Sequence, residues 1–164
     1  CRECTAVHVH YRTHTANANG RVAVVTGARV KIGFHIALKL LRAGATVIGT
    51  TRFPYDAYHR FSRLDDYDNF SDRLILYGLD LRDIPSLLKF IEFVEKIAVP
   101  RGGIDILINN AAQTVRRPTY TYTTMVEREV AAATATFSAP PPPLKSYVSY
   151  VSSSGGSSSV GGGG

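Results

Sequence analysis

The sequence has little of what membrane spans, disulfide frameworks and secretory signals require. It contains no tryptophan, one methionine and only two cysteines, Cys1 and Cys4, both at the extreme N-terminus. No apolar run approaches the roughly 18 residues of a membrane span, and no basic segment followed by an apolar one marks a secretory signal. Two neighbouring cysteines provide no disulfide framework and favour a reducing compartment. We therefore expect a cytoplasmic protein without a membrane partner.

Charged residues are spread unevenly along the 164 residues. The formal net charge of +6 suits an anionic ligand, but no block of Lys and Arg with interleaved aromatics predicts nucleic-acid binding. After Ser138, Lys145 is the only charged residue, and Pro, Ser and Gly dominate. We expect residues 118–164 to be a low-complexity, disordered tail, in which Met125–Thr136 could form a modest helix.

The N-terminal residues 1–19 contain a dense group of cysteines and histidines. Together they could offer two thiolates and two imidazoles to Zn²⁺: Cys1, Cys4, His8, His10 and His14. Their spacing does not match a zinc finger, and no apolar core accompanies them. We therefore expect a flexible N-terminal arm without a metal site. Because the chain begins with Cys rather than Met, we also expect a fragment or an incomplete gene model.

Residues 20–117 alternate between strand and helix patterns. Continuous apolar runs predict four buried strands: Arg21–Thr26, Ala45–Thr50, Leu74–Leu79 and Ile104–Asn109. Apolar residues at helical spacing predict the intervening helices: Ile32–Ala43, Tyr55–Leu64 and a third that Asp83 can cap. Strands that alternate with helices pair in parallel through right-handed crossovers. We predict an α/β fold with a partial Rossmann-like parallel sheet of about four strands and flanking helices.

The first predicted strand leads through a Thr-Gly turn into a helix over Val22–Gly33, which reads VAVVTGARVKIG. This order sets a phosphate group against a helix N-terminus, where unpaired N–H groups and the helix dipole favour negative charge. Short motifs also follow the other three strands: Thr51-Arg52, Asp80-Leu81 and Asn109-Asn110-Ala111-Ala112. The carboxyl ends of parallel strands are where open α/β sheets bind their ligands.

Together these motifs resemble the short-chain dehydrogenase/reductase family, whose glycine motif is TGxxxGxG and whose fourth strand ends in NNAG. The resemblance covers Arg21–Arg117, the N-terminal cofactor-binding half of such an enzyme. It implies hydride transfer between a nicotinamide dinucleotide and a carbonyl or alcohol. It also implies the cofactor-binding residues: Thr26, Gly27, Arg29, Lys31, Ile32, Gly33, Thr51, Arg52, Asp80, Leu81, Asn109, Asn110 and Ala111.

Three matched positions carry distinct expectations. Gly27 and Gly33 match the first and last motif glycines, which allow the sharp turn and the close packing of helix on strand. Lys31 replaces the middle glycine, and its side chain either obstructs the pyrophosphate or contacts it through the ammonium group. Asp80 matches the acidic residue that accepts from the adenine amino group, although an aspartate here could also cap a turn.

The choice of cofactor depends on the end of the second strand. NAD-preferring relatives carry a carboxylate there that holds the ribose 2′-hydroxyl, whereas this chain has Thr51 followed by Arg52. An Arg fork can bind a 2′-phosphate, and Arg29 could add a second cation. We therefore expect NADP(H) rather than NAD(H), unless Arg52 is an ordinary surface arginine.

The catalytic residues that the resemblance implies are missing. The family uses a Tyr with a Lys four residues later, because the cation lowers the phenol pKa, and none of the nine tyrosines has such a partner. Ser153, in the run Tyr147–Gly155, is the weak candidate for the catalytic serine. We expect a chain that binds the cofactor without the family reaction. The alternatives are a truncated interaction or regulatory form that pairs with a full-length homologue, and a non-functional fragment.

Overall fold

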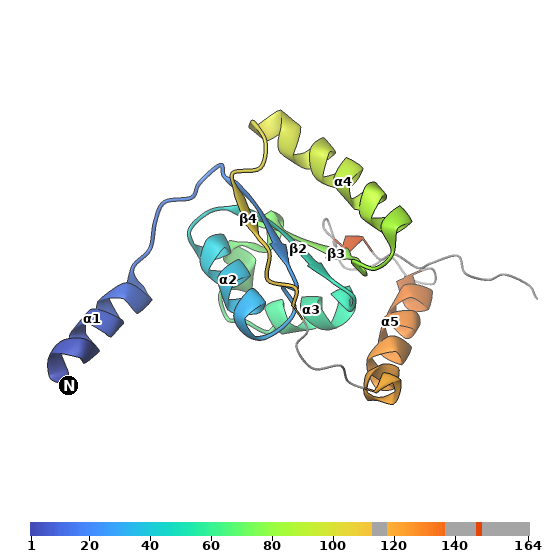
Figure 1. The fold of residues 1–164 in the computed structure, drawn as a ribbon, viewed down its shortest axis with the longest axis horizontal. Coiled ribbons are helices and arrows are strands. Elements are labelled where there is room, and N and C mark those ends of the chain that lie inside the picture. The colour runs from blue at the N-terminus through green and yellow to red at the C-terminus, as the bar shows by residue number, and fades with distance from the viewer. Residues whose placement is uncertain (113–117, 137–146, 149–164) are drawn as a thin grey trace, which may run out of the picture.

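The centre of the molecule is a parallel sheet, with the strand order β4-β1-β2-β3-β5 (Figure 1). The computed structural model describes residues 1–112, 118–136 and 147–148. Its strands are β1 (Val22–Thr26), β2 (Thr46–Thr51), β3 (Leu74–Gly78), β4 (Ile106–Ile108) and β5 (Tyr147–Val148). All adjacent pairs run in parallel. The predicted parallel sheet with flanking helices is therefore confirmed, and β3-β2-β1-β4 matches four of the six strands of the doubly wound order.

Helices connect the strands and flank the sheet. The α-helices are α1 (Arg2–Thr13), α2 (Lys31–Arg42), α3 (Pro54–Phe61), α4 (Ile84–Ala98) and α5 (Thr123–Thr136). Short 3₁₀ turns are η1 (Tyr67–Asn69), η2 (Ser71–Arg73), η3 (Val99–Arg101) and η4 (Thr119–Tyr122). As expected, the Asp83 carboxylate caps α4 by accepting from the Ser86 backbone N–H. This bond satisfies one of the donors that every helix N-terminus leaves open.

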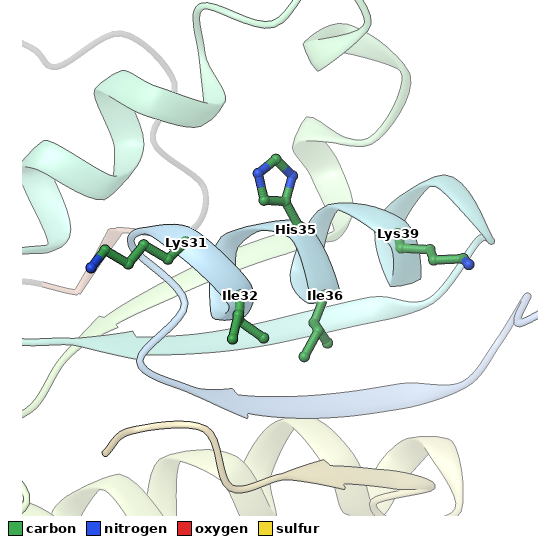
Figure 2. Close-up of a pocket in the computed structure, with 5 residues that line it drawn as sticks. All are labelled: Lys31, Ile32, His35, Ile36 and Lys39. Carbon is green, nitrogen blue, oxygen red and sulfur yellow. The ribbon is translucent and has the colours of Figure 1, made fainter. Parts of the chain in front are cut away.

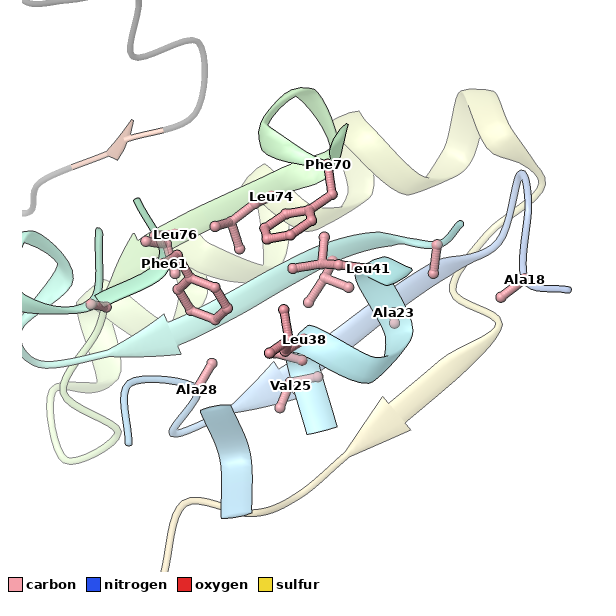
Figure 3. Close-up of a cluster of buried hydrophobic side chains, with 14 residues drawn as sticks. Ala18, Ala23, Val25, Ala28, Leu38, Leu41, Phe61, Phe70, Leu74 and Leu76 are labelled. Carbon is pink, nitrogen blue, oxygen red and sulfur yellow. The ribbon is translucent and has the colours of Figure 1, made fainter. Parts of the chain in front are cut away.

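The core has two parts because side chains of a buried strand alternate between its faces. Ala23 and Val25 of β1 point to the face that α2 and α3 cover, where Leu41 and Phe61 join them (Figure 3). The neighbouring β1 residues belong to the opposite cluster beneath α4: Val22 and Val24, with Phe90, Val94 and Ala98 from the helix. Two covered faces explain why the strands read as continuous apolar runs.

The fifth strand lies at an unexpected place. Tyr147 and Val148 pair with Leu76 and Tyr77 of β3, at the opposite side of the sheet from β4. In a complete doubly wound sheet, the fifth strand lies beside the fourth. The described part of the run Tyr147–Gly155, which holds the candidate Ser153, therefore does not take the place of the fifth strand in that order. Ser153 itself lies outside the residues that the structure describes.

Both segments outside the predicted domain contain helices, one of which we had allowed for at Met125–Thr136. Residues 2–13 of the predicted flexible arm form α1, which buries no residue. Residues 119–136 of the predicted disordered tail form η4 and α5, and Glu129 of α5 accepts from the backbone N–H groups of Tyr55 and Asp56 in α3. Folded structure therefore extends beyond Arg117, the end that the low-complexity composition suggested. In the part of the chain described, no helix is long and apolar enough to cross a membrane.

Asp105 attaches the start of β4 to the start of β1. Its carboxylate accepts from the Val22 backbone N–H at 2.8 Å and forms an ion pair with Arg21 at 2.5 Å. The Val22 N–H and the Arg21 guanidinium hold the pKa of Asp105 below its ordinary value. A carboxylate with a lowered pKa stabilises the fold above its unfolded-state pKa and loses that contribution as the pH falls through the folded value.

We expect Asp105→Asn to lower the melting temperature at pH 7 and to flatten its decline below about pH 4, where free aspartate titrates. The reason is that the variant keeps a hydrogen-bond acceptor but carries no charge that acid can remove. Thermal unfolding followed by circular dichroism from pH 7 to pH 3 measures both effects. The control is Asp65→Asn, at an exposed position. If the melting temperature of Asp105→Asn falls as steeply with acid as that of the wild type, the stabilising role of the Asp105 charge is refuted.

Candidate cofactor-binding site

The turn after β1 brings the N-terminus of α2 against the backbone of the strand. Gly27 has a φ of 71°, and a Cβ atom there would lie 3.1 Å from the Ala111 Cα. A Cβ on Gly33 would collide with the Gly27 carbonyl oxygen and with the Asn110 side-chain amide. Both glycines are therefore required by geometry, in the roles that the sequence pattern predicted.

Thr26 and Asn110 join the carboxyl ends of β1 and β4. The Thr26 hydroxyl accepts from the backbone N–H groups of Asn110 and Ala111, each at 3.0 Å. The Asn110 side-chain amide donates to the carbonyl oxygens of Thr26 at 3.1 Å and Gly27 at 3.2 Å. These hydrogen bonds fix the glycine turn to the end of β4. Asn109, by contrast, is exposed.

Lys31 adopts the backbone conformation of the glycine that it replaces. Its φ is +53°, the only positive value among the non-glycine residues described. It is also the first residue of α2, whose N-cap residue, Val30, forms no side-chain capping bond, and whose first turn contains no acidic residue. The opening N–H groups of α2 are thus not capped by a side chain, which is the arrangement that attracts an anion.

A cleft of about 650 Å³ lies at the carboxyl edge of the sheet. Its walls come from the glycine turn, the ends of β2 and β3, and the segment after β4. Eleven of the thirteen residues expected to bind the cofactor line it: Gly27, Arg29, Lys31, Ile32, Gly33, Thr51, Arg52, Asp80, Leu81, Asn110 and Ala111. The other two, Thr26 at the end of β1 and Asn109, are not among the residues that line the cleft. The four motifs thus share one cleft, because parallel strands place their carboxyl ends together.

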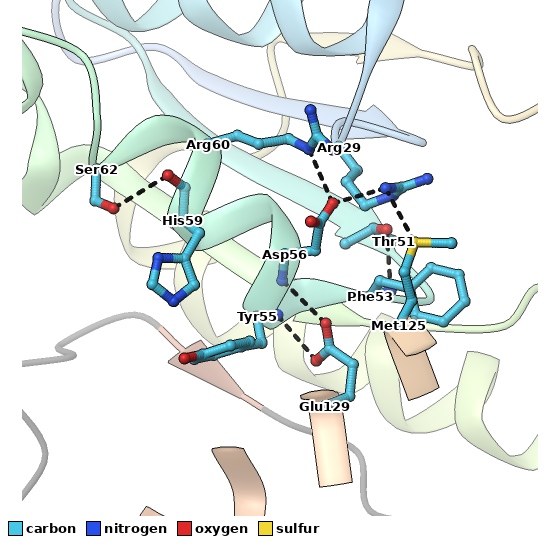
Figure 4. A network of polar contacts seen from close by, with 10 residues as sticks. All are labelled: Arg29, Thr51, Phe53, Tyr55, Asp56, His59, Arg60, Ser62, Met125 and Glu129. Carbon is cyan, nitrogen blue, oxygen red and sulfur yellow. Dashed lines mark hydrogen bonds and ion pairs between the residues drawn. The ribbon is translucent and has the colours of Figure 1, made fainter. Parts of the chain in front are cut away.

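The two arginines expected at the 2′-phosphate have different surroundings, and Figure 4 shows those of Arg29. Arg29 forms an ion pair with Asp56 at 2.7 Å, and Asp56 also pairs with Arg60 at 2.8 Å. Burial raises the pKa of Asp56, but the hydrogen bonds from Arg60 and Arg29 outweigh it and leave the pKa below its ordinary value. Arg52 is exposed, and within the described ranges it forms no ion pair.

Asp80 and Thr51 already have partners within the protein. The Asp80 carboxylate binds Arg82 in a fork, at 3.0 and 2.5 Å, and also accepts from the Arg82 backbone N–H. The Arg82 side chain lowers the pKa of Asp80, so this carboxyl stays ionised. The Thr51 hydroxyl accepts from the Phe53 backbone N–H at 3.1 Å. Asp80 therefore forms the turn contact that is the alternative to adenine binding.

Aromatic residues beside the cleft were missing from our sequence-based predictions. The rings of Phe53 and Tyr122 stack with their centroids 5.8 Å apart, at an interplanar angle of 17°. The Arg29 and Arg52 guanidinium carbons lie 5.4 and 5.5 Å from the centre of the Phe53 ring. Phe53 could have been predicted, because it directly follows Arg52 in the sequence. Nothing in the composition around Tyr122 indicated that it would return to this edge.

The N-terminal Cys and His residues do not assemble into a metal site within the described part of the chain. No three His, Cys, Asp or Glu side chains there are grouped as ligands of an ion. Cys1 and Cys4 are free and exposed. The Cys1 sulfur accepts from the Cys4 backbone N–H at the start of α1, so at least one of them has a local structural role as a helix cap.

Comparison with known proteins identifies the family. The family model for short chain dehydrogenases matches residues 21–137. The chain belongs to this family. It is 41% identical over 119 residues to an uncharacterized protein of Acanthamoeba polyphaga mimivirus, covering 70% of this chain and 25% of that protein. The first curated relatives are matched over only about a quarter to a third of their lengths.

Solved short-chain dehydrogenases share the fold. A metagenomic short-chain oxidoreductase in complex with NADP is 27% identical, with a TM-score of 0.50, over 70% of this chain and 49% of that one. Carveol dehydrogenase from Mycobacterium avium, in complex with NAD, is 21% identical, with a TM-score of 0.50, over 70% of this chain and 44% of that one. The second likeness concerns the fold alone.

We expect Lys31→Gly to raise the free energy of unfolding by about 1 kcal/mol, because a left-handed backbone costs an L-residue roughly 1–2 kcal/mol. Urea unfolding provides the measurement. Lys39→Gly is the matched control, since Lys39 lies within α2, where glycine costs about 1 kcal/mol. The two variants should shift stability in opposite directions, and destabilisation by both would show that Lys31 is not strained.

Proposed function

We propose that the cleft binds a nicotinamide dinucleotide and that it prefers NADP(H) to NAD(H). The observation that carries this proposal is the junction of β1 and α2, where Gly27 and Gly33 bring an uncapped helix N-terminus to the wall of the cleft. Unpaired N–H groups and the helix dipole favour the pyrophosphate at that point. The Lys31 ammonium group adds positive charge on the same wall.

The preference for NADP(H) rests on the end of β2. Thr51 offers no carboxylate to repel a 2′-phosphate, and its hydroxyl is already hydrogen-bonded to the Phe53 N–H. Arg52 lines the cleft and forms no ion pair in the described residues, although its charge also acts on the Asp80 carboxylate, so its guanidinium N–H groups can bind a phosphate. Arg29 shares the Asp56 carboxylate with Arg60, so its charge is only partly compensated. We therefore assign the 2′-phosphate to Arg52, with a smaller contribution from Arg29.

The parent reaction that we infer is hydride transfer to or from a small carbonyl or alcohol, for which the bound nicotinamide supplies or accepts the hydride. This chain orients the cofactor through the glycine turn, but its 164 residues contain no Tyr with a Lys four positions later. A phenol of ordinary pKa is a weak acid/base at neutral pH, so the chain binds without turnover. The free thiols of Cys1 and Cys4 support a cytoplasmic location.

We expect Arg52→Asp to weaken NADPH binding roughly tenfold or more, since hydrogen bonds between charged groups contribute about 1.5–3 kcal/mol. NADH binding should change far less, because NADH has no 2′-phosphate. Titration followed by nicotinamide fluorescence gives both dissociation constants. Arg63→Asp, at an exposed position outside the cleft, controls for net charge. Equal losses for the two nucleotides would refute the role of Arg52, and absence of NADPH binding to the wild type would refute the binding function.

A second candidate function is pairing with a homologue of the same family through the β4 side of the sheet. Among the described strands, β4 pairs only with β1, and Leu107 is 58% exposed. Ile32 and Ile36 project together from one flank of α2 (Figure 2), and Ile32 is 69% exposed. An open strand edge beside exposed apolar side chains is typical of a protein-binding surface.

If this pairing occurs between copies of the chain, sedimentation velocity should reveal a species heavier than the 17.9 kDa monomer. Leu107→Arg should convert it to monomer, because a buried, unpaired charge strongly disfavours an interface. Val130→Arg, on the exposed side of α5, should leave it intact. A wild-type chain that sediments only as a monomer would contradict self-pairing.

A further inference from the structure

The adenosine side of the cleft contains an aromatic pair built from distant parts of the sequence. Phe53 follows β2 and is buried, whereas Tyr122 ends η4. Their rings stack at 5.8 Å with an interplanar angle of 17°. The Arg52 guanidinium carbon lies 5.5 Å from the Phe53 ring centre and 5.0 Å from the Tyr122 ring centre. Arg52 is therefore supported by two ring systems at once.

The contacts of the neighbouring arginines distinguish Arg52 from them. Arg29 is paired with Asp56, and Arg82 with Asp80. Arg52 packs on aromatic rings, and the part of the chain that the structure describes shows no ion pair for it. Cation–π contact restricts the guanidinium without using its N–H donors. The side chain is thus held in place while its hydrogen-bonding capacity remains available to a ligand.

Two side chains of α5, the helix that follows Tyr122, contact α3 and Arg29 (Figure 4). The Glu129 carboxylate accepts from the backbone N–H groups of Tyr55 at 2.9 Å and Asp56 at 3.0 Å, which caps the N-terminus of α3. A carboxylate is favourable there because of the open N–H groups and the helix dipole. The Met125 sulfur also accepts from Arg29 at 3.5 Å. Since η4 leads directly into α5, these contacts hold Tyr122 beside Arg52.

We propose that Tyr122, together with Phe53, is a positioning residue that determines specificity for a 2′-phosphorylated nucleotide by holding the Arg52 guanidinium in place. This proposal rests on the proposed NADP(H) site. A free arginine side chain loses rotamer entropy when it binds a phosphate. An arginine that is already ordered by contact with aromatic rings loses less entropy on binding. The aromatic pair therefore strengthens binding of the 2′-phosphate while leaving the rest of the nucleotide unaffected.

Tyr122→Ala should weaken binding of NADPH and of 2′,5′-ADP roughly fivefold, the order expected for an exposed cation–π contact and a lost ordering effect. Binding of NADH and 5′-AMP should stay within about twofold, because they have no 2′-phosphate. Tyr122→Phe keeps the ring and should behave as the wild type. Tyr120→Ala is the matched control, since Tyr120 lies in the same η4 turn and is 79% exposed.

A double-mutant cycle provides the sharpest test. In an Arg52→Ala background, Tyr122→Ala should have no further effect on the NADPH affinity, because the guanidinium that it positions is gone. Thermal unfolding of each variant checks that the fold persists. If Tyr122→Ala weakens NADPH and NADH equally, or leaves NADPH unchanged, the positioning role is refuted.

The same measurements separate this proposal from the proposed function. If Arg52→Asp discriminates between NADPH and NADH while Tyr122→Ala does not, the cofactor assignment stands and only the positioning role fails. If Arg52→Asp does not discriminate, the 2′-phosphate assignment fails and the positioning role fails with it. Tyr122→Phe decides whether the ring or the hydroxyl matters, and loss of discrimination in this variant would overturn the aromatic mechanism.

Discussion

The close approach of α2 to the end of β1 is the constraint on which the rest of the structure depends. It is possible only because Gly33 has no Cβ, which would otherwise collide with the Gly27 carbonyl and the Asn110 amide. Asn110 in turn donates to the carbonyls of Thr26 and Gly27, so the turn and the end of β4 are held as one unit. This contact brings the open N-terminus of α2 to the cleft and allows α2 to cover one face of the sheet.

Charge compensation then divides the cationic side chains of the cleft into two groups. Arg29 pairs with Asp56, which also binds Arg60, and Arg82 pairs with Asp80, so part of their positive charge is compensated within the protein. Arg52 packs on Phe53 and Tyr122 instead. Because aromatic rings stabilise a cation without neutralising it, the cleft retains positive charge at the end of β2, where nucleotide specificity is decided in this fold.

The residues after Pro118 change the interpretation of the chain. Their composition is typical of a disordered tail, yet Glu129 caps α3 and Tyr122 stacks on Phe53, which lines the cleft. Helix propensity alone explains little of this, since most helical stability in proteins comes from tertiary packing. The β4 side of the sheet differs: its strand has a single neighbour among those described, and it leaves Leu107 exposed. Among the described residues, the β3 edge of the sheet therefore has an added strand, whereas the β4 edge has none.

The sequence by itself determined the alternation of strands and helices, the glycine turn, the Asp83 cap and the four motifs at one sheet edge. These features follow from local periodicity, from φ requirements and from the parallel topology. Only the tertiary structure decided that Arg29 pairs with Asp56, that Asp80 binds Arg82, that β5 pairs with β3, and that Tyr122 stacks beside Arg52. Local sequence patterns could not decide the long-range contacts among these, because they join side chains far apart in the chain, and their partners depend on how the completed sheet and helices bring those side chains together.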